Sequence, residues 1–152
     1  MDPTVATIVE LNKGVHGAIR RVVADLDAEA LAWTPGAETS SISVLVVHTL
    51  GSEAAMLRQI RGLPWIRDRD AEFVVRATTA TELLARLDEA DALLDEHAAA
   101  ISADDLAAIR ERPGRDPHPG RDWLIGNYGH AREHLGQMLL TKQLYQQRTG
   151  GS

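Results

Sequence analysis

Two histidines in the second half of the chain have the spacing of a metal-binding pair. His130 and His134 begin and end the segment HAREH, which lies inside a largely apolar run from residue 123 to residue 145. In a helix, side chains four residues apart lie on the same face, one turn apart. Their imidazoles can therefore bind one metal ion, at roughly 2.0–2.1 Å from each nitrogen if the ion is zinc. Since a chain of this length with 6 histidines contains such a pair by chance about 0.2 times, a site needs further ligands.

The best candidate for a third ligand is His48, in the apolar segment VVHTL of the first half of the chain. Three neutral imidazoles without a thiolate leave one coordination position open for water or substrate, which is typical of catalytic sites. Zinc or nickel suits these ligands best, and iron or cobalt also fits. The other histidines fit less well. We expect His97 to be buried for packing, His16 to be exposed and His118 to lie in a solvated loop.

Three polar residues beside the pair are candidates for supporting roles. Glu133 is a candidate general base, although it points roughly 100° away from His134 around the helix, and a surface charge is the alternative interpretation. Asn127 and Gln137 share the face of the two histidines and are candidates for orienting the imidazoles through hydrogen bonds. Ordinary helix polarity explains these two amides equally well.

Two other metal chemistries are excluded by the residues around the pair. HAREH fits the inverted metalloprotease pattern H-x-x-E-H, which needs an acidic ligand further along the chain, but residues 135–152 contain no Asp or Glu. Di-iron carboxylate bundles need Glu-x-x-His on two helices. No Glu in this sequence has a His three positions later, so a di-iron site is excluded as well.

Apolar residues recur at helical spacing along most of the chain and predict four long helices. We expect these helices over residues 4–26, 42–61, 79–101 and 122–147. Asp122 is the expected cap of the last helix, Ser102 is expected to cap a short turn through residue 109, and residues 112–120 are expected to form a loop. The prediction is an all-α fold, a four-helix bundle forming a single domain over residues 1–148, with a disordered tail at residues 149–152.

The connection between the second and third predicted helices is unusually long for neighbouring helices. It has about 18 residues and spans up to ~60 Å when extended, whereas a helix of 20 residues is only about 30 Å long. Antiparallel neighbours in a bundle need only short loops. The length therefore predicts a chain that returns along the whole bundle and leaves the second and third helices parallel.

Composition excludes several classes of function. The chain has 152 residues, with 16 basic and 22 acidic residues and a net charge of −6, which argues against a nucleic-acid-binding surface. No apolar stretch approaches the roughly 20 residues of a membrane-spanning helix, and the N-terminus lacks the features of a signal peptide. The absence of cysteine excludes disulfides and thiolate ligands and fits a cytoplasmic protein.

Three segments together resemble the DinB-like family, which includes the metal-binding N-terminal domain of mycothiol-dependent maleylpyruvate isomerases. They are WTPG at residues 33–36 with SISVLVVH at residues 41–48, then Glu53, and finally YGHAREHLGQ at residues 128–137. The resemblance implies an up-down-down-up bundle with the long connection between helices 2 and 3. It also implies a divalent metal on His48, His130 and His134, and frequent homodimers. Known activities in that family use a low-molecular-weight thiol, namely mycothiol, bacillithiol or glutathione.

We therefore expect a divalent-metal-dependent enzyme that acts on a small molecule, as a thiol-dependent S-transferase or a hydrolase. The alternative function is a non-catalytic metal-binding or stress-response protein that forms a dimer. A bundle whose histidines bind no metal is the third option. The isomerases carry a further C-terminal domain, and this sequence stops after the predicted bundle, so isomerisation of maleylpyruvate is not expected.

Overall fold

The computed structural model describes residues 1–74 and 78–149 and has an all-α architecture, as the sequence predicts. Its long helices are α1 (Pro3–Val23), α3 (Ile42–Ile60), α5 (Ala80–Ala100) and α7 (Gly120–Thr149). The short helices α2 (Ala28–Ala32), α4 (Arg69–Glu72) and α6 (Ala103–Ala107) lie in the connections. One hairpin is also present, made of β1 (Ile109–Arg112) and β2 (Arg115–Pro119).

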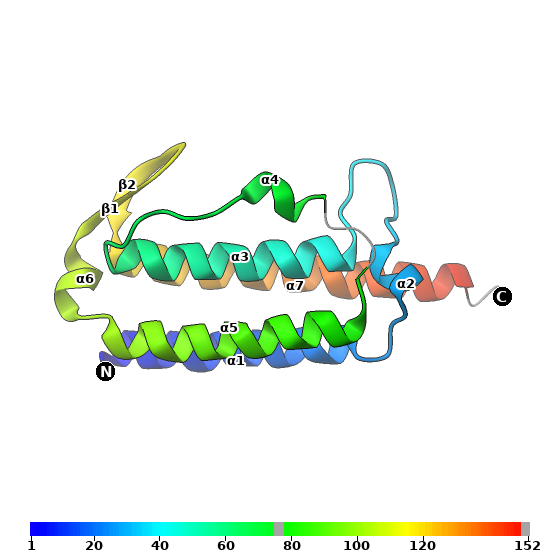
Figure 1. The fold of residues 1–152 in the computed structure, drawn as a ribbon, viewed down its shortest axis with the longest axis horizontal. Helices are drawn as coiled ribbons and strands as arrows, with labels where there is room; N and C mark the ends of the chain where they lie inside the picture. The colour runs from blue at the N-terminus through cyan, green and yellow to red at the C-terminus, as the bar shows by residue number, and fades with distance from the viewer. Residues whose placement is uncertain (75–77, 150–152) are drawn as a thin grey trace.

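The four long helices form a bundle in which α3 and α5 run in the same direction. In Figure 1, α1 and α7 run from left to right, and α3 and α5 run from right to left. The connection between α3 and α5 passes back along the outside of α3, and α4 lies in it. This course is the one that the length of the connection predicts.

Apolar faces of all four long helices meet in two clusters along the bundle. One cluster, at the end where α1 leads into α2, includes Ile19, Leu87 and Met138, and the other includes Met56 and Leu94. All five side chains are fully buried. Each such side chain contributes about 1.5–3 kcal/mol by leaving water, so this packing fixes the mutual positions of α3 and α7.

The N-caps of the long helices that the sequence predicts are observed at α3 and α5 but not at α7. Thr79 and Glu82 form a capping box at the start of α5, and Ser41 caps α3. The prediction that Asp122 caps the last helix is wrong, because α7 already begins at Gly120, whose N–H donates to the carbonyl of Ala108. At its other end α7 includes Thr149, so the predicted tail overlaps the helix by one residue, and residues 150–152 lie outside the described residues.

The predicted loop over residues 112–120 is also wrong, because most of these residues belong to the hairpin of β1 and β2. Gly114, with a φ of +74°, allows the tight turn between the strands. Side chains anchor β1 to the bundle: the Gln59 amide donates to the carbonyl of Glu111 at 2.6 Å, and the Trp123 indole donates to that of Arg110 at 3.0 Å. These anchors come from distant positions, so local composition does not reveal them.

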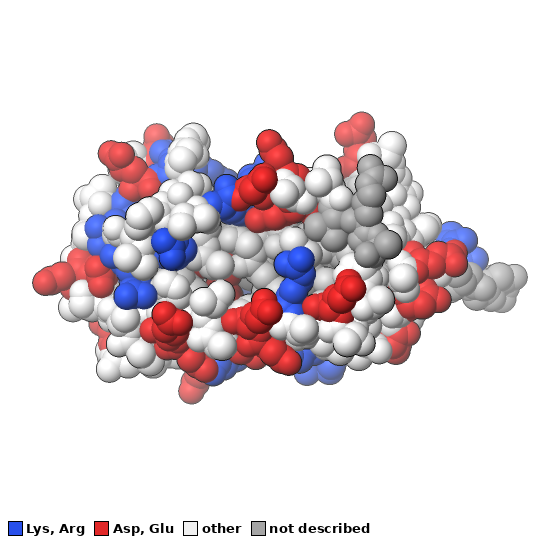
Figure 2. All heavy atoms as spheres, viewed as in Figure 1, with Lys and Arg blue, Asp and Glu red and all other residues white. Residues whose placement is uncertain are grey.

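Surface charge follows the acidic composition. Acidic side chains gather over α5 on the face shown in Figure 2, while Lys and Arg lie among acidic residues around α4. Within the described residues, no helix is both long and apolar enough to cross a membrane.

Candidate metal centre

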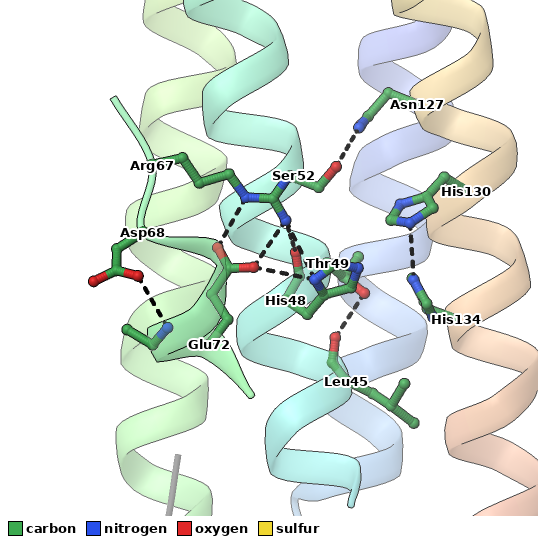
Figure 3. Close-up of polar contacts among 11 residues, drawn as sticks. Leu45, His48, Thr49, Ser52, Arg67, Asp68, Glu72, Asn127, His130 and His134 are labelled. Atoms are coloured by element: carbon green, nitrogen blue, oxygen red, sulfur yellow. Dashed lines mark hydrogen bonds and ion pairs between the residues drawn. The ribbon is translucent and has the colours of Figure 1, made fainter. Parts of the chain in front are cut away.

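His48, His130 and His134 come together in the middle of the bundle, as Figure 3 shows. His48 lies on α3 and is 5% exposed, and the other two lie on successive turns of α7 and are partly buried. One nitrogen of each ring lies within 4.8 Å of the others. The Nε2 atoms of His130 and His134 are 2.9 Å apart, close to the roughly 3.3 Å between two ligands of a tetrahedral zinc ion.

The environment keeps two of these imidazoles neutral, which is the form that binds a metal. Burial, followed by the neighbouring His134 and His48 and by Arg112 and Arg67, lowers the pKa of His130 to about 4. Burial also lowers the pKa of His48, and His134 and Arg67 act in the same direction against the opposing effect of Glu72. Crowded imidazoles next to arginines do not bind protons readily, so these nitrogens are free to act as ligands.

Glu72, on α4, holds the ring of His48 from the side away from α7 (Figure 3). Its Oε1 lies 3.1 Å from Nδ1 of His48. When Nδ1–H donates to this carboxylate, the lone pair of Nε2 is free for a metal. A carboxylate behind a ligating histidine is a common arrangement that fixes the ring and raises its basicity.

Arg67 in turn fixes Glu72. Its Nε donates to Oε2 at 3.0 Å and its NH2 group donates to Oε1 at 2.8 Å, so the pair is bidentate. The same NH2 group lies 3.2 Å from Nδ1 of His48. In the tautomer that carries a proton on Nδ1 both atoms are donors, so there the contact is not a hydrogen bond. The Arg67 side chain is only 4% exposed. The geometry of His48 is therefore set by a buried chain of charged groups.

Two local features of the sequence place Glu72. Asp68 accepts the N–H of Ala71 at 3.0 Å and caps the four-residue helix α4. Gly51 on α3 leaves room for the carboxylate, because a Cβ at this position would overlap the Glu72 side chain. Neither Glu72 nor Arg67 could be found from the pattern of the sequence. A capped turn of four residues gives no periodic signal in the sequence.

The predicted supporting residues have different surroundings. Gln137 is exposed, and its Oε1 lies 2.7 Å from Nδ1 of His134, where it can orient that ring. Asn127 instead donates to Oγ of Ser52 at 3.1 Å, and its buried Oδ1 has no hydrogen-bond partner in the part of the chain that the structure describes. Glu133 is exposed beside the histidines. The structure thus brings an amide to one imidazole, but it is Gln137 rather than Asn127.

The three histidines open onto a pocket of about 490 Å³. Its wall includes Glu133 and Gln137 from α7, Phe73 and Arg69 from the connection and Leu140 further along α7. The ring of Phe73 lies 4.9 Å from that of His48, measured between centroids. A small molecule in this pocket would contact apolar side chains and lie against the imidazoles.

The other histidines lie outside this centre. His97 is buried, as predicted, with Nδ1 3.1 Å from Arg61. His118 is exposed, as predicted, but lies on β2 against the ring of Trp123. The prediction for His16 is wrong: it is 1% exposed.

His16 is buried because carboxylates meet both of its nitrogens. Nε2 lies 3.1 Å from Glu53 and Nδ1 lies 2.7 Å from Asp91. Burial alone would lower the pKa of His16, but the two carboxylates outweigh it and the pKa is raised. Asp91 also accepts from Arg20 at 2.7 Å. His16 is therefore a buried polar link between α1, α3 and α5. The apolar stripe of one helix cannot predict the burial of His16, because its partners Glu53 and Asp91 lie on other helices.

The comparison with protein families agrees with these observations. The profile of the DinB superfamily matches residues 13–138, which include all three histidines. The chain belongs to the DinB superfamily. The comparison with curated proteins found no match.

Solved structures share the same fold at low sequence identity. A conserved protein from Enterococcus faecalis has a TM-score of 0.77 and 17% identity, and covers 95% of this chain and 97% of its own. A DinB-like protein from Bacillus cereus has a TM-score of 0.72 and 17% identity, with coverage of 94% and 91%. A mutant of the mycothiol-dependent maleylpyruvate isomerase has a TM-score of 0.71 and 14% identity. It covers 91% of this chain, which in turn spans 63% of the isomerase.

Proposed function

We propose that this protein is a divalent-metal-dependent enzyme acting on a small molecule, as a thiol-dependent S-transferase or a hydrolase. The observation that carries the proposal is the group of His48, His130 and His134 at the wall of a pocket of about 490 Å³. Structural metal sites are usually closed by four protein ligands, whereas three ligands beside a pocket leave a position for substrate. The thiol is suggested by a similar structure, whose enzyme is described as mycothiol-dependent.

The ligands favour zinc or nickel, and iron or cobalt also fits. A metal held there supplies Lewis-acid activation of a water or thiol. The protein's own contribution is orientation: Glu72 fixes the ring of His48, and Gln137 fixes the ring of His134. Both contacts leave the Nε2 atoms facing the common centre.

Glu133 is the proposed general base. It lines the same pocket as the histidines and is exposed, so it can take a proton from a water or thiol bound there. Glu38 also lines the pocket, from the segment between α2 and α3. We place the base at Glu133 because it lies on the same rigid helix as two of the ligands. Replacing it should lower kcat and leave the metal content unchanged.

Metal analysis of untagged protein tests the metal. We expect close to one zinc or nickel ion per chain in wild type and a loss of most of it in His134→Ala. Protein with less than about 0.2 metal per chain, unchanged by His134→Ala, would refute the metal site.

The reaction is tested with a panel of low-molecular-weight thiols and electrophilic acceptors, together with simple esters and amides for the hydrolase. Glu133→Gln should lower turnover by about 100-fold or more, while Arg132→Gln, an exposed neighbour on α7, should not. A metal-loaded protein without turnover on any of these substrates would favour the alternative function, a non-catalytic metal-binding or stress-response protein.

We further propose that the protein forms a homodimer in the cytoplasm. Support comes from exposed leucines toward the end of α7, where Leu139, Leu140 and Leu144 are 45%, 56% and 36% exposed. Light scattering should give twice the mass of one chain, and Leu140→Glu should shift the protein toward the monomer. A monomeric wild type at micromolar concentration would refute the dimer.

A further inference from the structure

Four arginines line one cavity beside the candidate metal centre. Arg67 and Arg69 come from the connection that carries α4, and Arg112 and Arg115 come from the two strands of the hairpin. The cavity measures about 350 Å³, and Trp65 and Pro113 complete its wall. None of the described residues lining it carries a carboxylate. In a chain with a net charge of −6, this is a local concentration of positive charge.

The charge of three of these arginines is not balanced by an ion pair among the described residues. Arg67 pairs with Glu72, but no carboxylate of residues 1–74 or 78–149 lies within salt-bridge distance of Arg69, Arg112 or Arg115. Arg112 is half-buried, and burial together with Arg67, Arg115 and Arg69 lowers its pKa, against a weaker effect of Glu72. Repulsion between partly buried positive charges destabilises the fold unless an anion binds between them.

Ring contacts account for the position of two of these arginines but not for their charge. The guanidinium of Arg112 lies 5.2 Å from the centroid of Trp65, and that of Arg69 lies 4.8 Å from the centroid of Phe73. Such contacts fix the position of the arginine side chains and leave their N–H groups free to donate hydrogen bonds to a ligand. Arg115 is exposed and has no such contact among the described residues. Packing alone therefore does not explain why all three lie at one cavity.

The arginine cavity adjoins the metal centre on two sides. Arg69 also lines the pocket of the three histidines. Arg112 and Arg115 also line a third cavity, of about 360 Å³, whose wall includes His130 and Asn127.

Two buried polar atoms at this third cavity lack a partner. Asn127 is 7% exposed, and its Oδ1 has no hydrogen bond among the described residues; the same holds for Nδ1 of His130. Asp122 is the carboxylate of this wall and lies 3.8 Å from Arg121. Of these two atoms, only Nδ1 of His130 can donate a hydrogen bond to an anion, since the amide oxygen of Asn127 accepts. The oxygen of Asn127 suits a hydroxyl or N–H group of the same ligand.

We propose that Arg69, Arg112 and Arg115 bind an anionic group of the substrate, a carboxylate or a phosphate, and so hold the reacting part of the molecule at the three histidines. The planar guanidinium fork suits both groups through paired hydrogen bonds. This inference rests on the proposed function, which it deepens by assigning the substrate to small organic anions. It also gives the hairpin a role, because β1 and β2 supply two of the three arginines.

The test is calorimetric titration of the protein with inorganic phosphate and with succinate at constant ionic strength. We expect wild type to bind at least one of the two, with or without zinc, because the arginines and not the metal hold the anion. Arg112→Gln and Arg115→Gln should each weaken binding about tenfold or more. Arg132→Gln makes the same change of charge at an exposed position of α7 and should leave binding unchanged.

The results separate this inference from the proposed function. Failure of wild type to bind either anion, or equal binding by wild type and both variants, would overturn the anion site. Binding that depends on the arginines in a protein that takes up no zinc would support the site and refute the metal-dependent function. If Arg112→Gln does not fold, Arg115→Gln gives the same readout, because its side chain is exposed. The anion that binds with the higher affinity indicates whether the substrate carries a carboxylate or a phosphate.

Discussion

Replacing Glu72 by glutamine should weaken zinc binding although Glu72 is not itself a ligand. The carboxylate accepts from Nδ1 of His48 at 3.1 Å and is held by two hydrogen bonds from Arg67. The neutral amide in Glu72→Gln keeps the size of the side chain but removes the charge that raises the basicity of the ring. It also removes the preference for the tautomer in which Nε2 is free.

The expected loss follows from this arrangement. Removing the hydrogen-bond partner of a ligating histidine typically costs 10- to 100-fold in metal affinity, or about 1.4 to 2.7 kcal/mol. We expect the upper part of this range, because Glu72 and His48 are both buried and water cannot easily replace the carboxylate. Arg67 also loses its ion partner while 4% exposed, so the metal-free protein should lose about 3 kcal/mol of unfolding free energy.

The assay is competition for zinc between the protein and a chromogenic chelator, with folding checked by circular dichroism. Glu133→Gln is the matched control, since it removes an exposed carboxylate next to His134 and should leave the affinity unchanged. A Glu72→Gln protein that is folded and binds zinc as tightly as wild type, while His134→Ala does not bind it, would show that the contact with His48 has no effect on the metal.

Three further predictions follow from single contacts. Gly51→Ala should lower zinc affinity about 10-fold or more, because the new Cβ displaces Glu72; an unchanged chelator competition would contradict this. Gln137→Ala should lower zinc affinity less, by about 10-fold at most, since water can reach His134 at this exposed position. The pKa of His16 is higher in the folded protein than its ordinary value of 6.5. Protonation of His16 therefore stabilises the fold below pH 6.5, and this stabilisation is lost as the pH rises through the pKa of the folded state. The free energy of unfolding of wild type, measured with denaturant, should therefore decrease as the pH rises from 6 to 9. The His16→Gln variant should not show this decrease.

The helices and the three candidate ligands could be predicted because their signals are local. Helical periodicity covers about 20 residues in each long element, and the i, i+4 spacing of His130 and His134 places both rings on one face whatever the rest of the fold does. The role of His48 needed one further assumption, that a polar residue in an apolar stretch faces a partner. The long connection predicted parallel α3 and α5 because chain length limits which ends it can join.

What the sequence did not predict depends on contacts between distant segments. Glu72 and Arg67 act on His48 from a short capped turn 24 and 19 residues away, and four residues are too few for a periodic signal. The apolar stripe of α1 predicts an exposed His16, which lies off that stripe, yet Glu53 and Asp91 contact both of its ring nitrogens and so allow the ring to be buried. The hairpin is anchored by Gln59 and Trp123, and β2, which contains Pro117 and Pro119, lacks the usual alternation of a strand.

The position of α7 in the bundle has a consequence for how the protein is made. This last helix packs against both α1 and α3 and carries two of the three candidate ligands. More than half of the chain separates His48 from His130, so during synthesis the first ligand leaves the ribosome long before the other two. Until α7 has docked, His48 lacks the other two candidate ligands, and the nascent chain does not have the proposed three-histidine site. Metal uptake at the proposed site would then be a late event of biosynthesis, and a ribosome-bound chain halted before residue 120 should not retain zinc.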